Sequence, residues 1–410
     1  MISNIVANSK KLNLLPIAGI KLGTTCANIK YPNRKDLVLI ELSDSTSTAA
    51  VFTKNQFCAA PVIISKQHLQ ESNPRYLLIN TGNANAGTGQ RGLDDSKQTC
   101  LAVASSANCN ENQVLVFSTG VIGENLAMDK ILAGIPQSYR NLSDTSQSWA
   151  DAAQGIMTTD TVAKGHSTQL TIAGKAITIT GIAKGSGMIR PDMATMLAYI
   201  ATDAKVKSSL LQQCLQNAVD KSFNRITVDG DTSTNDSCLL LASGASKVEI
   251  TADNMFDFQL ALTQLCENLA KDMIRDGEGA TKLITLNIIN GSEQQECIDL
   301  AYLIAHSPLV KTAFFASDPN WGRLLAVVGR ADIKNLDLTK IKIYLDDLCI
   351  VSNGGRDSGY TEEVAQKIMD QTEITVTVDL ARSDNDKNQA TVWTCDFSTE
   401  YVRINAEYRT

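Results

Sequence analysis

Residues 184–204 read Lys184-Gly-Ser-Gly-Met-Ile-Arg-Pro-Asp-Met-Ala-Thr-Met-Leu-Ala-Tyr-Ile-Ala-Thr-Asp-Ala204, a glycine-rich turn that runs into small and bulky apolar residues. One threonine, Thr195, stands near the middle of this stretch. A threonine hydroxyl is a poor nucleophile unless a base lies beside it, and one solution is to cut the chain so that the threonine's own α-amine becomes the base. The ordinary pKa of an α-amine is near 8, which suits that role at neutral pH. Thr195 is therefore the candidate nucleophile.

Two other interpretations of this stretch compete with a self-processing threonine. A hydroxyl nucleophile can instead use a histidine, but the only three histidines are His68, His166 and His306, and none lies in a recognisable triad context. In the plainest interpretation, Ala-Thr-Met-Leu begins a buried helix and Thr195 is an ordinary cap. The residues around the stretch decide between these interpretations.

The stretch resembles the self-cleavage site of the ornithine acetyltransferase family, also called the arginine-biosynthesis glutamate N-acetyltransferases. In that family the bond before the threonine of an Ala-Thr-Met-Leu run is broken, which in this chain is Ala194–Thr195. Further blocks of the family occur in the right order along nearly the whole chain: Asn80-Thr-Gly-Asn-Ala-Asn-Ala86, Ser118-Thr-Gly-Val-Ile-Gly123, Met157-Thr-Thr-Asp-Thr161, Thr227-Val-Asp-Gly-Asp-Thr-Ser-Thr-Asn-Asp236, Asp318-Pro-Asn-Trp-Gly-Arg323 and Ile404-Asn-Ala-Glu-Tyr-Arg-Thr410.

Two residues beside the expected cut depart from the family pattern. Arg190 stands where a small residue or histidine is usual, and Asp192 stands where asparagine is usual. Since both flank the scissile bond, the rate of cleavage is the property that they put in question.

Composition places the chain among ordinary soluble globular proteins. It has 410 residues, of which 43% are hydrophobic and 20% charged, and its net charge is −7. A negative charge is the wrong sign for general attraction to phosphate backbones or anionic lipid, so we expect no nucleic-acid or membrane partner. No apolar run approaches the roughly 20 residues that span a bilayer. The N-terminus lacks the continuous apolar block of a signal peptide, so we expect a cytoplasmic protein.

None of the candidate metal-binding or nucleotide-binding motifs in the sequence has the residue spacing that such a site requires. The ten cysteines include no C-x-x-C pair, so we expect reduced core thiols. Gly87-Thr-Gly-Gln-Arg-Gly92 fits a dinucleotide fingerprint, but no acidic residue ends a second strand about 20 positions on. Asp229, Asp231 and Asp236 lack the terminal glutamate of a calcium loop. We expect these three carboxylates to accept backbone N–H groups instead.

Strand-like and helix-like segments alternate without a strict repeat, which favours an α+β layered fold. The helical period appears in residues 206–219, 256–273, 300–313 and 361–371. Runs rich in β-branched residues predict strands at Leu37–Leu42, Tyr76–Ile79, Val114–Phe117, Leu170–Ile182, Ile284–Ile289, Ile341–Tyr344 and Ile374–Val378.

The resemblance implies a more specific architecture than the pattern does. It implies a sandwich of two β-sheets between helical layers, shared with the self-processing aminopeptidases. It also implies two chains from one precursor, an α chain of residues 1–194 and a β chain of residues 195–410 that begins with Thr195. Residues 283–410 are expected to form a smaller C-terminal α/β subdomain. The chains would stay together, and the resemblance implies a heterotetramer of two α and two β chains.

The resemblance assigns the oxyanion hole to Thr119 and Gly120. This pair follows the apolar run Val114–Phe117, so it falls at the end of a predicted strand, where a hydroxyl and a backbone N–H can converge. Such donors matter because charge appears on the carbonyl oxygen only in the transition state.

The resemblance also assigns the substrate contacts, which are Thr158, Lys184, Thr195, Glu278, Asn405 and Thr410. Lys184 is a compact cation that suits the carboxylate of an amino-acid substrate. Glu278 suits a cationic amine such as that of ornithine. Charged contacts of this kind favour an amino-acid substrate over an uncharged one.

The reaction implied is acetyl transfer from N-acetyl-L-ornithine to L-glutamate through an acetyl-Thr195 intermediate, in arginine biosynthesis. Neither a metal nor an organic cofactor is required. The family contains members that also use acetyl-CoA as a co-substrate to make N-acetylglutamate and members that do not, and no residue of this chain decides between them. The alternative from another class is a self-processing aminopeptidase or amidase, in which water accepts the acyl group. A noncatalytic binding protein is the third interpretation, and it predicts no cleavage.

Overall fold

The computed structural model describes residues 12–190, 196–383, 385 and 387–407. The chain divides into two compact units. Of the described residues, the larger unit comprises 12–190, 196–224 and 231–273, and the smaller comprises 225–230, 274–383, 385 and 387–407. Each unit has a sheet-based core of its own.

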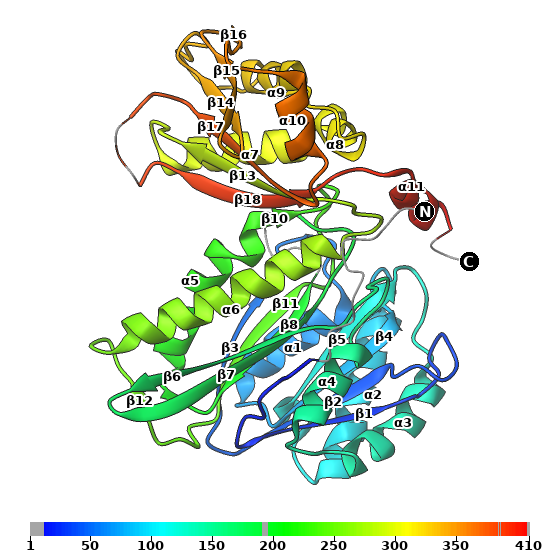
Figure 1. Cartoon of the computed structure of the whole chain (residues 1–410). Helices are drawn as coiled ribbons and strands as arrows, with labels where there is room; N and C mark the ends of the chain where they lie inside the picture. Colours follow the sequence, from blue (N-terminus) through cyan, green and yellow to red (C-terminus); the bar gives the residue numbers. More distant parts are fainter. Residues whose placement is uncertain (1–11, 191–195, 384, 386, 408–410) are drawn as a thin grey trace. The chain divides into compact units, whose positions relative to one another are not determined.

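Two β-sheets form the centre of the larger unit (Figure 1). The first has the order β1-β2-β4-β5, with bounds β1 Ile20–Thr25, β2 Leu37–Leu42, β4 Tyr76–Asn83 and β5 Val114–Val121. The second has the order β3-β11-β8-β7-β6, with bounds β3 Ser47–Phe52, β11 Ser237–Ala242, β8 Leu197–Thr202, β7 Lys175–Lys184 and β6 Lys164–Ile172. A further pair of short parallel strands is β9 Lys205–Val206 with β12 Glu249–Ile250.

Strands β2, β4 and β5 of the first sheet each begin with a continuous apolar run, because both faces of the sheet are buried there. In β2, Val38 and Ile40 belong to a core cluster that also holds Tyr199 and Leu239 of the second sheet. Leu37 and Leu39 belong to a different cluster. Since successive strand side chains point to opposite faces, the first cluster fills the space between the two sheets.

Helices cover the outer faces of both sheets. The cluster of Leu37 and Leu39 contains residues of α1 Ala60–Glu71, α2 Gly89–Ala107 and α3 Met128–Arg140. On the second sheet, α5 Ser208–Lys221 contacts β3 and β11, and α6 Met255–Arg275 packs Leu265 and Leu269 against Gly181 of β7. α4 Ser146–Gly155 places Trp149 in the cluster between the sheets. The layered α+β sandwich is therefore confirmed within this unit.

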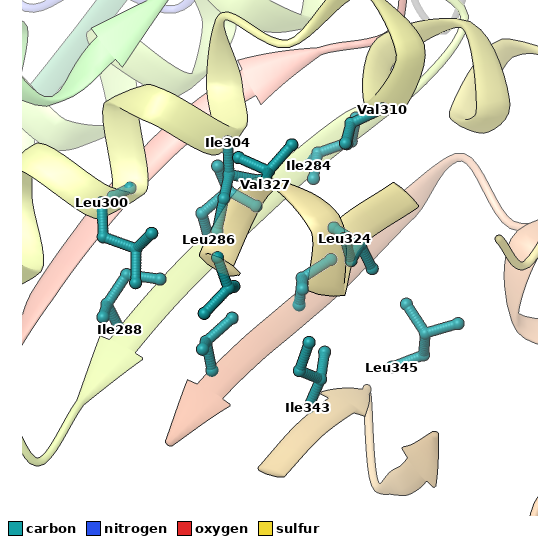
Figure 2. Close-up of a cluster of buried hydrophobic side chains, with 14 of the residues drawn as sticks. Ile284, Leu286, Ile288, Leu300, Ile304, Val310, Leu324, Val327, Ile343 and Leu345 are labelled. Atoms are coloured by element: carbon teal, nitrogen blue, oxygen red, sulfur yellow. The ribbon is translucent and has the colours of Figure 1, made fainter. Parts of the chain in front are cut away.

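The smaller unit has a seven-stranded mixed sheet of order β10-β18-β13-β17-β14-β15-β16. Figure 2 shows its core, where Ile284, Leu286 and Ile288 of β13 meet Leu300 and Ile304 of a covering helix. The strands are β10 Ile226–Thr227, β13 Leu283–Ile289, β14 Lys342–Leu345, β15 Leu348–Ser352, β16 Gly355–Arg356, β17 Glu373–Asp379 and β18 Ala390–Cys395. The helices are α7 Gln294–Ala305, α8 Pro308–Phe315, α9 Trp321–Gly329, α10 Glu362–Met369 and α11 Thr399–Ala406.

Two expectations about elements were wrong, and a third element differs from an alternative interpretation of the sequence. The single strand expected at Leu170–Ile182 lies within a hairpin of β6 and β7, because Ala173 and Gly174 turn the chain with φ of 50° and 73°. The helix expected at 300–313 ends at Ala305, and Pro308 starts α8. The buried helix considered after Ala-Thr-Met-Leu is instead strand β8.

Cysteine burial agrees only in part with the expectation of core thiols. All ten cysteines are free, and Cys100, Cys214, Cys238, Cys266, Cys297 and Cys395 are buried, but Cys26 is exposed. Among the described helices, none combines the length and apolarity needed to cross a bilayer. The expected division of the chain at residue 194 stays a prediction.

Candidate active site

Thr119 and Gly120 lie near the carboxyl end of β5, beside the parallel strand β4. Gly120 has φ of 137°, and a Cβ placed on it would come within 2.3 Å of the carbonyl carbon of Gly82. Only glycine fits this position, because any larger residue would collide with the β4 backbone. The backbone of β5 therefore passes unusually close to β4 at the residue that follows Thr119.

A buried lysine donates directly to the Thr119 side chain. Lys184 Nζ lies 3.0 Å from Thr119 Oγ1, and the two residues are 3% and 5% exposed. An ammonium group has donors and no acceptor, so Thr119 Oγ1 is the acceptor in this bond. The hydroxyl hydrogen of Thr119 can therefore be donated to a different acceptor.

Asp160 organises the loop that carries Thr158 and the turn that follows Lys184. Its Oδ1 accepts from Lys164 Nζ at 2.6 Å and from the Gly185 N–H at 2.8 Å, while its Oδ2 accepts from the Thr158 N–H at 2.9 Å. Burial alone would raise the pKa of Asp160, but the charges of Lys164 and Lys184 hold it below its ordinary value. The carboxylate is therefore ionised, and it fixes Thr158 near the turn after Lys184.

Sequence reasoning missed Asp160 and Lys164 as members of this site. Both are buried, and their ion pair spans four positions of the chain. Asp160 stood inside a quoted block, Met157-Thr-Thr-Asp-Thr161, with a lysine four residues on. An acid and a base at that spacing were a visible signal, although the spacing alone does not distinguish a buried pair from a solvated one.

The predicted cleavage site itself, Ala194 and Thr195, lies outside the described residues, as does Asp192. Arg190 is exposed. The next residue after Thr195 is Met196, whose N–H donates to Asp236 Oδ1 at 2.9 Å and whose carbonyl accepts from the Ser237 N–H at 3.1 Å. Asp236 thus accepts a backbone N–H, as expected, but from a strand 40 residues away.

Asn235, the neighbour of Asp236, bonds to the first sheet. Its Nδ2 donates to the Ala84 carbonyl at 2.6 Å and to the Ser118 carbonyl at 2.9 Å. Ser118 immediately precedes Thr119. Neither Asn235 nor Asp236 was among the expected site residues, although both end a quoted family block.

In the smaller unit, Glu278 and Asn405 are in contact. Asn405 Nδ2 donates to Glu278 Oε2 at 2.8 Å, and Glu278 is 8% exposed. Asn405 belongs to α11, which is fastened to the turn around Glu278 by the bond from Ser398 Oγ to the Gly279 carbonyl at 2.7 Å. Thr410 lies outside the described residues.

The structure therefore brings the expected residues together in two groups. In the larger unit, hydrogen bonds connect the buried pair Thr119 and Lys184 and, through Asp160 and Gly185, the half-buried Thr158, while Gly120 follows Thr119 in β5. In the smaller unit, Glu278 and Asn405 form a bonded pair. The first group offers a fixed hydroxyl donor and a cation, and the second offers a carboxylate.

Comparison with known protein families matches residues 21–410 to the family described as ArgJ. The arginine biosynthesis bifunctional protein ArgJ of Pseudomonas syringae pv. tomato is 52% identical over 401 residues, which cover 97% of this chain and 98% of that protein. The protein of the same name from Methylococcus capsulatus is 51% identical over 406 residues, with 98% of each chain covered.

Two solved structures are also similar. One is the arginine biosynthesis bifunctional protein ArgJ of Bacillus halodurans, 36% identical with a TM-score of 0.47, covering 50% of this chain and 95% of that one. The other is the ornithine acetyltransferase of Mycobacterium tuberculosis complexed with ornithine, 33% identical with a TM-score of 0.38, covering 44% of this chain and 94% of that one.

Proposed function

The chain belongs to the ArgJ family, and on that premise we propose that it moves the acetyl group of N-acetyl-L-ornithine to L-glutamate through an ester on Thr195. As a member of this family it is an acetyltransferase of arginine biosynthesis. The donor, the acceptor, the nucleophile and the prior self-cleavage are the parts that we propose.

The first step is self-cleavage between Ala194 and Thr195. Thr195 Oγ attacks the Ala194 carbonyl carbon, the C–N bond breaks, and the nitrogen takes the hydroxyl proton. Water then hydrolyses the resulting ester, giving Ala194 a carboxylate and returning the hydrogen to Thr195 Oγ. The product is a free α-amine on Thr195.

In the acetyl transfer, the α-amine of Thr195 accepts the hydroxyl proton while Oγ attacks the acetyl carbon of N-acetylornithine. The amide C–N bond breaks and the ornithine nitrogen takes that proton as it leaves. The amine of glutamate then attacks the acetyl ester, and Thr195 Oγ recovers its hydrogen. Both half-reactions use one nucleophile, so we expect ping-pong kinetics.

One observation carries the assignment of the oxyanion hole: the bond from Lys184 Nζ to Thr119 Oγ1. Because the lysine can only donate, this bond orients the Thr119 hydroxyl as a donor before any substrate arrives. Catalysis by such donors depends on their being fixed in place, since they then need no reorganisation when negative charge develops on the oxygen. The N–H of Gly120 would be the second donor.

The substrate charges match the two groups of residues. Lys184 supplies a cation for a carboxylate, and Glu278 supplies a carboxylate for the side-chain amine of ornithine. A relative is described as complexed with ornithine, which supports an ornithine-derived donor for this chain. Its similar relatives are named bifunctional, which supports acetyl-CoA as a second acetyl donor for glutamate.

Incubation of the purified protein with N-acetylornithine carrying a labelled acetyl group and with glutamate tests the proposal. We expect labelled acetylglutamate, and mass spectrometry of the acid-quenched enzyme should find the label on Thr195. Labelled acetate in place of acetylglutamate would identify the hydrolase alternative. A Thr195→Ala protein that stays uncut and yet matches the wild-type rate would contradict the proposed mechanism.

The same preparation tests the assembly. Two α and two β chains should give twice the 44.2 kDa of the precursor in size exclusion with light scattering. Replacing N-acetylornithine by acetyl-CoA in the assay tests the second donor, with acetylglutamate as the expected product.

A further inference from the structure

Two consecutive buried residues, Asn235 and Asp236, lie immediately before β11, at the point where three strands meet. β11 begins at Ser237, which is paired in parallel register with Leu197, the first residue of β8. Met196 and Asp236 are therefore the residues just before two neighbouring strands. Both belong to the larger unit, together with Thr119 and Lys184.

Asp236 bonds to the strand that follows the predicted nucleophile. Its Oδ1 accepts the N–H of Met196 at 2.9 Å, and that nitrogen belongs to the peptide bond between Thr195 and Met196. Asp236 is 0% exposed. A fully buried carboxyl group costs several kcal/mol when it is charged, so its presence here calls for an explanation beyond packing.

Asn235 bonds to the strands that carry the oxyanion donors. Its Nδ2 donates to the carbonyls of Ala84 and Ser118, which lie at the ends of β4 and β5. Its Oδ1 accepts from Thr234 Oγ1 at 2.5 Å, so the amide orientation is fixed. Adjacent side chains therefore reach in two directions, one to each sheet.

We propose that Asn235 and Asp236 are a positioning pair that holds Met196, and through it the Thr195 nucleophile, against the oxyanion donors Thr119 and Gly120. The inference rests on the proposed function, because it takes Thr195 as the nucleophile. A displacement of about 1 Å between a nucleophile and its oxyanion hole can slow a reaction about 100-fold, so a clamp between the two strands has a direct effect on rate.

The pair acts with Asp236 in its neutral form. A negative carboxylate at this position would favour the protonated form of a nearby α-amine, which could then no longer act as a base. Complete burial raises the pKa of Asp236 well above its usual range, although the Met196 N–H and the charge of Lys184 oppose this. Asparagine has the shape and neutrality of a protonated aspartic acid, and it keeps the acceptor oxygen for Met196.

Three variants separate this role from simple packing. Asp236→Asn keeps the neutral acceptor, Asp236→Ala removes it, and Asn235→Asp replaces the amide donor with an oxygen that faces two carbonyl oxygens. Asp203→Ala is the matched control, because Asp203 directly follows the other end of β8 and accepts the Thr178 N–H at 2.9 Å. Folding of each variant is checked by circular dichroism.

The full-length chains are made by cell-free synthesis, and the appearance of the two fragments is followed over time. We expect the control to be cut at the wild-type rate, Asp236→Asn to be within about threefold of it, and Asp236→Ala and Asn235→Asp to be at least about tenfold slower. In the cut fraction of the slow variants, kcat should fall by a similar factor while KM for N-acetylornithine stays within about twofold.

The following outcomes would contradict the proposed positioning role of Asn235 and Asp236. Wild-type cleavage rate and kcat in Asp236→Ala and Asn235→Asp would overturn the proposal while leaving the proposed function intact. If Asp203→Ala slows cleavage as much as Asp236→Ala does, loss of any side-chain bond at either end of β8 would explain the effect, and the specific role of the pair would be excluded. If Asp236→Ala does not fold, Asn235→Asp alone decides between these outcomes. A wild-type chain that is never cut would remove the proposed function and this inference together.

Discussion

At the scale of single residues, the Lys184–Thr119 bond joins two side chains that were expected to have separate tasks. Lys184 was expected to bind a carboxylate, and Thr119 to bind the oxyanion. The structure shows the ammonium donating to the hydroxyl in a buried setting, where such a charge-assisted bond is stronger than in water. Under the proposed function, Lys184 would thus have a second role, because its bond would orient Thr119 as an oxyanion donor.

Removing the Thr119 hydroxyl should slow catalysis without unfolding the protein. Loss of one oxyanion donor costs about 3 kcal/mol, so we expect Thr119→Ala to lower kcat by about 100-fold or more. Thr119→Ser keeps the hydroxyl and serves as the control, with kcat within several-fold of the wild type. Steady-state kinetics of both variants, with melting temperatures measured in parallel, test this, and unchanged turnover in a folded Thr119→Ala protein would remove the residue from the oxyanion hole.

Burial of Asp236 predicts how the stability of the folded protein depends on pH. Burial raises the pKa of Asp236 in the folded protein, so the folded state keeps its proton at pH values where the unfolded chain, with an ordinary pKa near 4, has lost it. Stability then falls as pH rises from about 4 towards the raised pKa, by up to about 1.4 kcal/mol per pH unit. Asp236→Asn does not titrate, so its stability relative to the wild type should increase from pH 5 to pH 7.

Urea unfolding of the mature proteins at those two pH values measures the difference. If the stability of Asp236→Asn relative to the wild type stays constant or falls from pH 5 to pH 7, Asp236 is ionised in the folded state and the prediction is wrong. Asp203→Asn provides a comparison, because Asp203 is only half-buried and burial raises its pKa too.

At the scale of elements, the β4–β5 pair determines where Thr119 and Gly120, the proposed oxyanion donors, stand. The two strands are parallel and in register from Tyr76 opposite Val114 to Gly82 opposite Gly120, and the register shifts at Asn83. Gly120 adopts its positive φ beside this irregularity, still inside β5. The position of the two residues therefore depends on how closely the two backbones approach.

A methyl group at Gly120 should separate these strands. Gly120→Ala would place its Cβ against the Gly82 backbone in a conformation that alanine rarely adopts. We expect at least about 2 kcal/mol of destabilisation and loss of self-cleavage. Gly123→Ala is the control, because Gly123 also has a positive φ of 84° but no atom lies within 4 Å of a Cβ there. Fragment formation and thermal unfolding of both variants distinguish steric separation from the cost of positive φ alone.

The boundaries of a strand or helix could be predicted from the sequence where the whole segment consists mainly of one kind of residue, such as apolar residues. β2 was found at its predicted bounds because every position from Leu37 to Leu42 except Glu41 is apolar and buried. The β6–β7 hairpin was missed because the turn at Ala173 and Gly174 interrupts a run of β-branched residues without a proline or asparagine to mark it.

At the scale of the whole molecule, the second sheet of the larger unit interleaves the two expected chains. β8 and β11 follow residue 195, whereas β3, β6 and β7 precede it. β8 lies between β7 and β11, and β11 lies between β3 and β8. Separation of the chains would therefore break two strand pairings and open the core between the sheets.

Cleaved protein should consequently behave as one particle. We expect the two fragments to co-elute in size exclusion under native conditions and to separate only in denaturant, because the exposed strand edges and apolar faces would cost far more than the bond that was cut. Co-elution at rising urea concentrations measures this. Separation in native buffer would show that the interleaved sheet does not hold the chains.

The sequence by itself determined which residue types are candidates for the chemistry, since the proposed threonine nucleophile, a Ser-Thr-Gly segment and a lysine before a glycine-rich segment are properties of the chain and are readable in order. The tertiary structure alone decided which of them touch. Lys184 is 65 positions from Thr119, and Asp236 is 40 positions from Met196, and such distances along the chain carry no information about contact. The two sheets bring these residues together because their facing apolar sides pack into one shared core.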